Sequence, residues 1–321
     1  MAKPRIIVTR RLPDPVERRL AEHFDAVFNR DDAPLTQDGL RHALTDADGV
    51  VPTVSDRIDA EVLGAKPLRA RLLANFGVGF NHINIEAART RGLAVTNTPG
   101  VLTDATADLA MTLMLMAARR AGEGERHVRA GDWTGWRPTH MMGHQVTGKT
   151  LGIIGFGRIG QAVARRAREG FGMTVLYYTP SPMSGAAADG AEACGSVEEL
   201  LARADFVSLH CPGGGATRHL IDSNHLAAMK PGAILVNTAR GDVIDEAALA
   251  KALADGRIAG AGLDVYEAEP TVHPDLLAQE NVVLLPHLGS ATEETRTAMG
   301  MKMADNALAF FAGEAPPDRV V

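Results

Sequence analysis

The sequence predicts an α/β protein with two domains, each built around a parallel sheet. Three observations lead to this fold class. The chain has 321 residues, more than one hydrophobic core usually organises. Short apolar runs alternate with amphipathic stretches in two separate series. The second series begins with the glycine fingerprint GFGRIG at residues 155–160, directly after an apolar run.

The first series occupies residues 5 to about 98. Its runs IIVT, VVPT, RLLAN and LAVT are expected to form strands, with helices between them. A helix is expected from Thr103 to about Arg120; its apolar part is shorter than the roughly 20 residues that span a bilayer, so we interpret it as buried. The helix from Ser290 to about Phe311 has no strand of the second sheet left to follow, so we expect it to return to the first domain.

The first domain is therefore predicted to be discontinuous, comprising residues 1–101 and 289–321, and residues 102–288 form the second. The second series contains the strand LGIIG, a helix to about Gly170, the strands TVLYY and FVSLH around the helix SVEELLARA, and a late strand NVVLL. Ser196 with Glu199, and Ser290 with Glu293, have the spacing of capping boxes. Asp245 similarly precedes a helical stretch. Residues 122–148 lack periodicity and are expected to form a functional or interface loop.

Composition excludes several classes of partner. Charged residues make up 22% of the chain, and the formal net charge of -6 gives no basis for binding nucleic acid or an anionic membrane. The start of the sequence, MAKPRIIVTR, has no apolar export segment, and Cys194 and Cys211 are the only cysteines. Both features fit a cytoplasmic protein without disulfides. His140 and His144 have zinc-ligand spacing, but the surrounding composition argues against a helix and no third ligand is near, so we predict no metal.

The glycine fingerprint predicts a dinucleotide site, because it follows an expected strand and opens an expected helix. Gly155 allows a tight turn, Gly157 lets a pyrophosphate approach the backbone, and Gly160 lets helix and strand pack closely. The helix amino terminus would then receive the phosphate charge.

The residue that would bind the adenosine ribose is unusual. NAD sites normally carry an acid at the end of the second strand, but TVLYY ends in Thr179, followed by Pro180, Ser181, Pro182 and Ser184. The missing carboxylate admits a 2'-phosphate, although no Arg follows Thr179 to bind it. We therefore predict NADP or NAD, with a slight preference for NADPH.

Three polar residues lie just beyond the apolar runs AILV, AGAGL and NVVLL: Arg240, Glu269 and His287. The carboxyl ends of parallel strands meet at one edge of a sheet, so we expect these side chains to converge. A carboxylate beside His287 would favour the imidazolium, which suits a general acid that protonates a carbonyl oxygen as hydride reaches its carbon. Arg240 can bind a carboxylate and that oxygen together through its planar fork.

The spacing of these residues and the segments around them resemble a known family. From Arg240 to Asp264 is 24 residues, to Glu269 a further 5, and to His287 a further 18. With GFGRIG, the segments NTARGDVID, GLDVYEAEP and LLPHLGSAT resemble the D-isomer-specific 2-hydroxyacid dehydrogenases over essentially the whole chain. The resemblance implies two Rossmann-like or flavodoxin-like domains, a discontinuous substrate domain and a dinucleotide-binding domain, with Arg240, Glu269 and His287 catalytic.

The resemblance also implies further site residues. The segment NFGVGFNHIN resembles the family's substrate loop, in which the backbone amides of Val78 and Gly79 hold the substrate carboxylate; Val54 and Phe76 are expected to line the pocket. Asp264 and Thr106 match positions near the nicotinamide, with ordinary structural roles as the alternative. The implied cofactor contacts outside the fingerprint glycines are Thr106, Arg158, Ile159, Thr179, His210, Cys211, Pro212, Thr217, Thr238, Ala239, Asp264 and Gly289.

Within the family, the run GDWTGWRPTHMMGHQVTGKT resembles the glyoxylate and hydroxypyruvate reductase branch. In that branch this region packs into a homodimer and a Trp approaches the neighbouring active site, a place that Trp133 or Trp136 could take; burial in a dimer interface is the alternative. The implied substrate is a small 2-oxo acid. A short phosphoglycerate or other D-2-hydroxyacid dehydrogenase remains open, as does an NAD(H)-sensing protein similar to the C-terminal-binding corepressors, which keep the same trio. Formate dehydrogenases carry Gln where Glu269 stands and are excluded.

Overall fold

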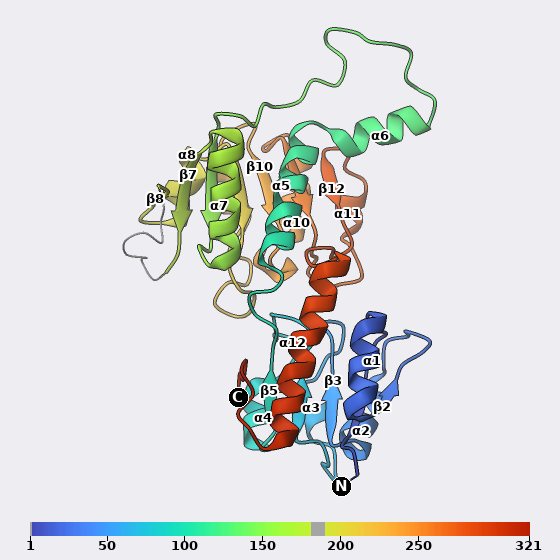
Figure 1. Cartoon of the computed structure of the whole chain (residues 1–321). Coiled ribbons are helices and arrows are strands. Elements are labelled where there is room, and N and C mark those ends of the chain that lie inside the picture. Colours follow the sequence, from blue (N-terminus) through green and yellow to red (C-terminus); the bar gives the residue numbers. More distant parts are fainter. Residues whose placement is uncertain (1, 181–189) are drawn as a thin grey trace. The chain divides into compact units, whose positions relative to one another are not determined.

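A computed structural model describes residues 2–180 and 190–321 (Figure 1). The chain divides into two compact units: unit 1 comprises Met1–Leu102 and Ala291–Val321, and unit 2 comprises Thr103–Ser290. All strand pairs in both units are parallel, so the predicted α/β class with two parallel sheets is confirmed.

Unit 1 has a five-stranded sheet in the order β2-β1-β3-β4-β5. This is the flavodoxin-like order, in which the connections change direction between β1 and β3. Its strands are β1 (Arg5–Val8), β2 (Asp25–Phe28), β3 (Gly49–Val51), β4 (Leu72–Ala74) and β5 (Ala94–Thr96). Its helices are α1 (Asp14–His23), α2 (Gln37–Asp46), α3 (Ala60–Leu63), α4 (Ile85–Thr90) and α12 (Glu293–Ala312).

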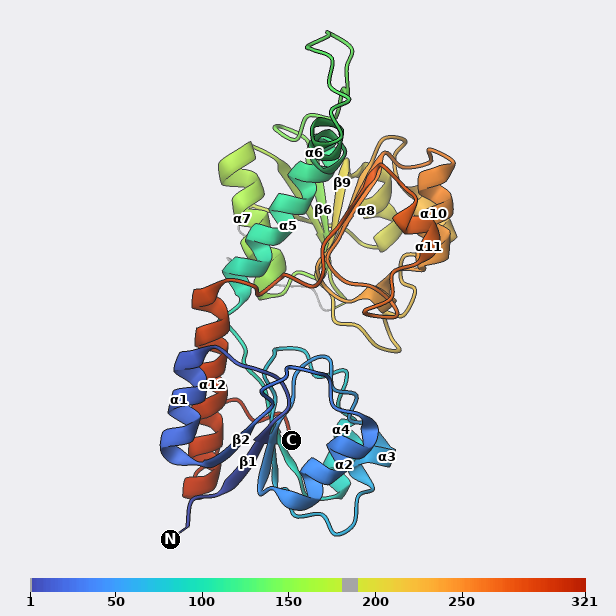
Figure 2. The same cartoon turned by 90° about the vertical axis from the view of Figure 1, so that its right-hand side faces the viewer.

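Helices cover both faces of this sheet (Figure 2). α1 and α12 pack on one face through buried residues such as Leu20 and Met303, and α2, α3 and α4 pack on the other through residues such as Leu40 and Val62. Strands buried on both faces are uniformly apolar, which explains the runs seen in the sequence. β2 is different: it lies at the sheet edge, and its residues are alternately exposed and half-buried, so no apolar run marks it.

Unit 2 has a seven-stranded sheet in the order β12-β11-β10-β9-β6-β7-β8. The connections change direction between β6 and β9, as in dinucleotide-binding sheets. Its strands are β6 (Thr150–Ile154), β7 (Thr174–Tyr178), β8 (Glu192–Ala193), β9 (Phe206–Leu209), β10 (Ile234–Asn237), β11 (Gly260–Leu263) and β12 (Val282–Leu284). Its α-helices are α5 (Thr103–Ala118), α6 (Ala121–Arg129), α7 (Arg158–Phe171), α8 (Val197–Arg203), α9 (Ser223–Ala228), α10 (Glu246–Ala254) and α11 (Pro274–Leu277).

The second sheet is also covered on both faces (Figure 2). α5 and α7 contribute to a core that includes Leu113 and Val163, while α8, α9 and α10 contribute to a core on the opposite face that includes Leu200 and Leu249. The sheet is therefore dry on both sides, and only its strand ends are available for polar side chains.

Two of the three predicted helix starts are confirmed. Ser196 Oγ accepts a hydrogen bond from the amide of Glu199 at 3.2 Å, and Asp245 Oδ1 accepts one from Ala248 at 3.0 Å. The predicted cap at Ser290 is wrong. α12 begins two residues later, because the chain is still extended at Thr292, whose hydroxyl caps the helix by accepting from the amide of Thr295 at 3.1 Å.

The expected loop at 122–148 is wrong in its first part, which forms α6. α6 buries no residue, so hydrophobic periodicity cannot reveal it. Ion pairs along the chain stabilise it instead, between Arg120 and Glu123 and between Glu125 and Arg129. Residues 130–149 contain no helix or strand and form an extended arm (Figure 1).

The arm exposes large apolar side chains, with 81% of Trp136 and 56% of Trp133 accessible to solvent. His140 lies in a turn of the arm and His144 beyond it, so neither is helical. Within residues 2–180 and 190–321, no three His, Cys, Asp or Glu side chains are grouped to hold a metal ion. Nor does that part of the chain contain a helix of the length and apolar character needed to cross a membrane.

Candidate active site

Polar residues gather at the carboxyl ends of the strands in unit 2. Gly155 directly follows β6, His210 follows β9, Asp264 follows β11, and Arg240 and His287 come three residues after β10 and β12. Because all these strands are parallel, their carboxyl ends lie along one edge of the sheet. The predicted convergence at this edge is therefore built into the topology.

Two members of the trio are in direct contact. Nδ1 of His287 lies 2.8 Å from Oε2 of Glu269. The other carboxylate oxygen, Oε1, accepts a hydrogen bond from the backbone amide of Tyr266 at 3.0 Å. Both oxygens of Glu269 are thus engaged, and the carboxylate fixes the imidazole with its proton on Nδ1. Nε2 of His287 makes no hydrogen bond to any described residue, and about a third of the side chain, 32%, is exposed.

The environment keeps Glu269 ionised. Burial alone would raise the pKa of this carboxyl, but the hydrogen bond and positive charge of His287, with the Tyr266 amide and the Arg240 cation, outweigh it and lower the pKa below its usual value. Glu269 is therefore a carboxylate in this pair and can accept a charge-assisted hydrogen bond.

The backbone of His287 is held in an unusual conformation. Its φ is 56°, in the left-handed region, which is uncommon for a residue with a side chain. Asp264 holds this turn at three points: its carbonyl oxygen accepts from His287 N at 2.9 Å, and its carboxylate accepts from Leu288 N at 2.6 Å and Gly289 N at 2.8 Å. Burial raises the pKa of Asp264 although these amide hydrogen bonds oppose it.

Asp264 and Thr106 therefore both have structural contacts at the turn that carries His287. The Thr106 hydroxyl donates a hydrogen bond to the carbonyl of Gly289 at 3.0 Å, which ties α5 to this turn. Their contacts with a nicotinamide stay predictions. The sequence could offer a structural role for Asp264 only as an alternative. The turn that Asp264 holds lies 23 to 25 residues further along the chain, and no local pattern connects the two.

Arg240 is positioned by the backbone around it. Asn237 closes a tight turn after β10: its Nδ2 donates to Arg240 O at 2.9 Å and its Oδ1 accepts from Ala239 N at 2.9 Å. The half-buried guanidinium donates to the Ala239 carbonyl at 2.6 Å. Burial lowers the pKa of Arg240 against the attraction of Glu269 and Asp242, but a guanidinium stays cationic in proteins.

Gly241 brings the Arg240 and Glu269 segments together. A Cβ atom on Gly241 would lie 1.8 Å from the backbone carbon of Tyr266, the residue whose amide binds Glu269. Only glycine allows this approach. Tyr266 and Gly241 are functional candidates that no motif in the sequence identifies, although a glycine directly after Arg240 is a signal of close backbone approach.

The fingerprint turn fits a bound dinucleotide. Gly155 has φ of 92° and packs so closely on the end of β9 that a Cβ would lie 2.4 Å from the amide nitrogen of Cys211. A Cβ on Gly160 would lie 2.4 Å from Gly155 O, whereas one on Gly157 would meet nothing within 4 Å. The surface above Gly157, at the amino terminus of α7, is open for a phosphate.

Other predicted cofactor residues lie at the same strand ends. Burial lowers the pKa of His210 to about 4, so its ring is neutral and shares a hydrogen bond with Ser208 Oγ at 2.8 Å. Burial raises the pKa of the Cys211 thiol to about 11, which keeps it protonated. The hydroxyl of Thr238, after β10, is buried and has no hydrogen-bond partner among the described residues. A polar ligand could satisfy it.

The remaining predicted cofactor residues occupy loops and the first turn of α7. Arg158 is exposed as the first residue of α7, followed by the half-buried Ile159. The hydroxyl of Thr217 closes the loop after β9 by donating to Pro212 O at 2.6 Å. Thr179 is half-buried just after β7, while Ser181, Pro182 and Ser184 lie outside the described residues.

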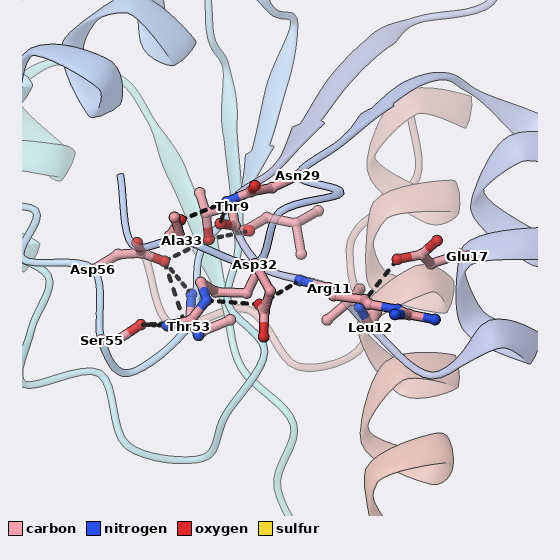
Figure 3. Close-up of polar contacts among 12 residues, drawn as sticks. Thr9, Arg11, Leu12, Glu17, Asn29, Asp32, Ala33, Thr53, Ser55 and Asp56 are labelled. Carbon is pink, nitrogen blue, oxygen red and sulfur yellow. Dashed lines mark hydrogen bonds and ion pairs between the residues drawn. The ribbon is translucent and has the colours of Figure 1, made fainter. Parts of the chain in front are cut away.

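The predicted substrate residues other than Arg240 and His287 are in unit 1, after β3 and β4. Val54 is 44% exposed, in a loop that Asp56 holds in place. Oδ2 of Asp56 accepts hydrogen bonds from the Thr53 amide at 2.7 Å and from the Thr9 hydroxyl at 2.5 Å (Figure 3). Because Thr9 follows β1, this cluster lies at the switch point of the first sheet. Phe76, Val78 and Gly79 are half-buried in the loop after β4.

Comparison with known proteins gives a consistent result. Residues 111–289 match the family described as D-isomer specific 2-hydroxyacid dehydrogenase, NAD binding domain. The glyoxylate reductase of Korarchaeum cryptofilum is 48% identical over 99% of this chain and 96% of its own length. The NADPH-dependent glyoxylate/hydroxypyruvate reductase of Sinorhizobium meliloti, solved with NADP and malonate, superposes with a TM-score of 0.87 at 36% identity, covering 100% of this chain and 97% of that one. The holo D-mandelate dehydrogenase of Rhodotorula graminis superposes with a TM-score of 0.88 at 33% identity, covering 100% and 98%.

Proposed function

Because the chain belongs to the D-isomer-specific 2-hydroxyacid dehydrogenase family of NAD(P)-dependent oxidoreductases, we propose that it reduces a small 2-oxo acid, glyoxylate or hydroxypyruvate, to the 2-hydroxy acid. The observation that carries this proposal is the His287–Glu269 pair at the strand ends of a dinucleotide-binding sheet. Glyoxylate reductases of similar length at 43% to 48% identity support the choice of substrate.

The residues at the strand ends can carry out the protein's part of this reaction. Gly155, Gly157 and Gly160 would hold the pyrophosphate. Thr238, whose hydroxyl has no partner among the described residues, would contact the cofactor farther along. When bound, the reduced nicotinamide supplies hydride to the carbonyl carbon. His287 gives the proton on Nε2 to the carbonyl oxygen, so a neutral alcohol forms and the imidazole is left neutral. Glu269 favours the charged imidazole beforehand, and Arg240 binds the substrate carboxylate and carbonyl oxygen.

A panel of 2-oxo acids tested with NADPH and NADH is the direct test of the proposed activity. We expect turnover of glyoxylate and hydroxypyruvate, with much lower kcat/KM for branched and aromatic oxo acids. Equal activity on phenylglyoxylate, the oxo acid of mandelate, would contradict the small pocket. Preferential turnover of phosphohydroxypyruvate would favour a phosphoglycerate dehydrogenase, and cofactor binding without turnover of any oxo acid would favour an NAD(H) sensor.

We propose a modest preference for NADPH. Thr179 stands where an acid would repel the 2'-phosphate, and the Sinorhizobium reductase is itself NADPH-dependent. Thr179 and Pro180 carry no charge that would repel either cofactor. We therefore expect both NADPH and NADH to support turnover. The measurement is kcat/KM for each cofactor at saturating glyoxylate. A preference for NADH of more than about tenfold, or ~1.4 kcal/mol, would overturn the proposal.

Replacing Glu269 by Gln should change the pH dependence of reduction. Reduction needs a proton on His287, so its rate falls as pH rises. Because the pKa of Glu269 is lowered, the carboxylate stays charged as the pH falls and supports the imidazolium throughout the working range. Without that charge, the descending limb of the kcat/KM profile should move to lower pH. An unmoved limb would show that Glu269 does not act through the charge of His287.

The exposed arm supports a homodimer. Trp133, Trp136 and Met142 present apolar surface on a segment that extends away from the rest of unit 2 (Figure 1). Such surface usually marks a protein interface. We propose that a second copy covers it and that Trp136 or Trp133 limits the size of the substrate. Light scattering should give twice the chain mass of 34.0 kDa; a monomer at working concentration would contradict the dimer.

A further inference from the structure

Two side-chain amides hold the carbonyl groups of the loop after β4. Asn75, wholly buried at the start of the loop, donates Nδ2 to the carbonyls of Gly77 at 3.0 Å and Gly79 at 3.1 Å. Asn97, which follows β5, donates Nδ2 to the carbonyl of Val78 at 2.9 Å. Three consecutive carbonyl groups are therefore fixed by donors from the same unit.

Two amides of the same loop have no partner among the described residues. Neither Val78 N–H nor Gly79 N–H donates a hydrogen bond to any residue of the described chain, although both residues are half-buried. The C=O and N–H of a peptide group point in opposite directions, so fixing the carbonyls of Gly77 and Val78 also fixes the directions of these two amides. Consecutive amides that point to one side form a concavity for an anion. Leaving them unpaired in a half-buried place is costly unless a ligand or water meets them.

We propose that Asn75 and Asn97 are positioning residues, which hold the loop so that the amides of Val78 and Gly79 can bind the substrate carboxylate. This inference rests on the proposed function, because it assumes a carboxylate substrate. Neither asparagine needs to touch the substrate. Each acts through the carbonyls that it holds, and together they donate a side-chain hydrogen bond to each of the three carbonyls; the backbone amide of Thr98 also donates to the carbonyl of Gly77, at 3.0 Å.

The C-terminal tail holds Asn97 in turn. The amide of Asn97 donates to Asp318 O at 3.2 Å, and its carbonyl accepts from Nδ2 of Asn306, a wholly buried residue of α12, at 3.2 Å. Asn306 and Asp318 exchange two more hydrogen bonds, at 3.1 and 2.9 Å, and Lys302 pairs with the Asp318 carboxylate at 3.0 Å. These hydrogen bonds connect the loop after β4, through Asn97, to Asn306 and Asp318. We call Asn75, Asn97, Asn306 and Asp318 the positioning set.

Substitutions at the two asparagines should weaken substrate binding selectively. Asn97→Ala removes the donor to Val78 O, and Asn75→Asp keeps the size of the side chain but replaces the donor to two carbonyls with an oxygen that repels them. We expect the KM for glyoxylate to rise about tenfold in each, with kcat changed by less than about threefold, because binding is lost equally in the ground and transition states. The KM for the nicotinamide cofactor should not change.

Two further variants test the tail. Asp318→Ala loses the acceptor for Asn306 and should raise the KM for glyoxylate about threefold, a partial loss of one hydrogen-bonded contact. Asp318→Asn keeps an oxygen acceptor for Asn306 and should restore KM to near the wild-type value. Equal KM in these two variants and in the wild type would remove Asp318 from the positioning set.

Asn281→Ala is the matched control. Like Asn97, Asn281 is half-buried and donates Nδ2 to one backbone carbonyl, that of Ala259 at 3.4 Å, but it lies just before β12, at the strand ends opposite the candidate site. Its loss should leave the KM for glyoxylate unchanged. If Asn281→Ala raises KM as much as Asn97→Ala does, the effect is general destabilisation and the proposal fails.

Amide NMR of the full chain separates this inference from the proposed function. Oxalate carries carboxylates but cannot accept hydride; on its addition to the wild type, the Val78 and Gly79 amide resonances should shift, and in Asn97→Ala the shift should need about tenfold more oxalate. Turnover of 2-oxo acids without any response at these two amides would overturn the positioning role alone. A response at these amides without turnover of any 2-oxo acid would support the positioning role and overturn the proposed function.

Discussion

His287→Ala is expected to abolish turnover and leave cofactor binding intact. The variant removes the only group of the trio that can give a proton to the carbonyl oxygen, and general acid catalysis of this kind contributes about 10² to 10⁴ in rate. The fingerprint glycines that would hold the dinucleotide are far from this change in sequence and do not depend on the imidazole. The measurements are kcat for glyoxylate reduction and Kd for the reduced cofactor by fluorescence titration.

His219→Ala provides the control for this variant. His219 also pairs with a glutamate, since its Nε2 lies 2.8 Å from Oε1 of Glu267, and both side chains are about as exposed as those of His287 and Glu269. It lies in the same unit but is not one of the trio. We expect wild-type kcat for His219→Ala. Near-normal turnover in His287→Ala would refute the role of His287 as the acid.

Arg240→Lys is expected to be nearly inactive although the positive charge is kept. The guanidinium can donate two parallel hydrogen bonds to a carboxylate and the adjoining carbonyl oxygen, whereas an ammonium cannot reproduce that geometry. A charged hydrogen bond contributes about 1.5 to 3 kcal/mol, so losing the paired arrangement should lower kcat/KM on the order of 10³. Steady-state kinetics with glyoxylate measures the loss.

Arg218→Lys is the matched substitution outside the trio. Arg218 pairs with Glu267, two residues from Glu269, and is exposed. An exposed ion pair of this kind contributes about 1 kcal/mol or less, so the activity should change little. If Arg240→Lys retains more than a tenth of the wild-type kcat/KM, the bidentate role assigned to Arg240 is wrong.

The sequence was sufficient for the fold class and for the expectation that His287 and Glu269 lie side by side. Strands buried on both faces give continuous apolar runs, and the polar residues directly after them mark the functional edge of a parallel sheet. His287 and Glu269 were expected to be neighbours, and the structure places Nδ1 of His287 2.8 Å from Oε2 of Glu269. The family identified by resemblance is confirmed by the match at residues 111–289.

Other features leave little trace in a single sequence. β2 is exposed at a sheet edge and α6 buries nothing, so neither has the apolar pattern that reveals a strand or helix. The start of α12 depended on which of two neighbouring hydroxyl residues caps it, and Thr292 rather than Ser290 does so. Such competition between local caps is decided by the backbone and not by residue type.

Long-range hydrogen bonds were the least predictable part of the site. Asn306 and Asn97 are 209 residues apart, and Thr106 and Gly289 are 183 residues apart. No periodicity or spacing links such partners. Side-chain amides and hydroxyls can donate to or accept from many groups, so the residue type does not specify the partner. The contacts of Asn75 and Asn97 with the substrate loop, and those of Asp264 with the turn that carries His287, could therefore be recognised only from the structure.

Transfer of deuterium from the reduced cofactor tests directly whether the protein reduces a 2-oxo acid by hydride transfer. Glyoxylate is incubated with the protein and reduced cofactor carrying deuterium at C4 of the nicotinamide, on each face in turn, and the product is examined by mass spectrometry and NMR. We expect glycolate with one deuterium on the alcohol carbon from one of the two labelled faces, and none in His287→Ala over the same time. Failure of the wild type to form labelled glycolate or any labelled 2-hydroxy acid from the corresponding oxo acid, despite measurable cofactor binding, would contradict this expectation.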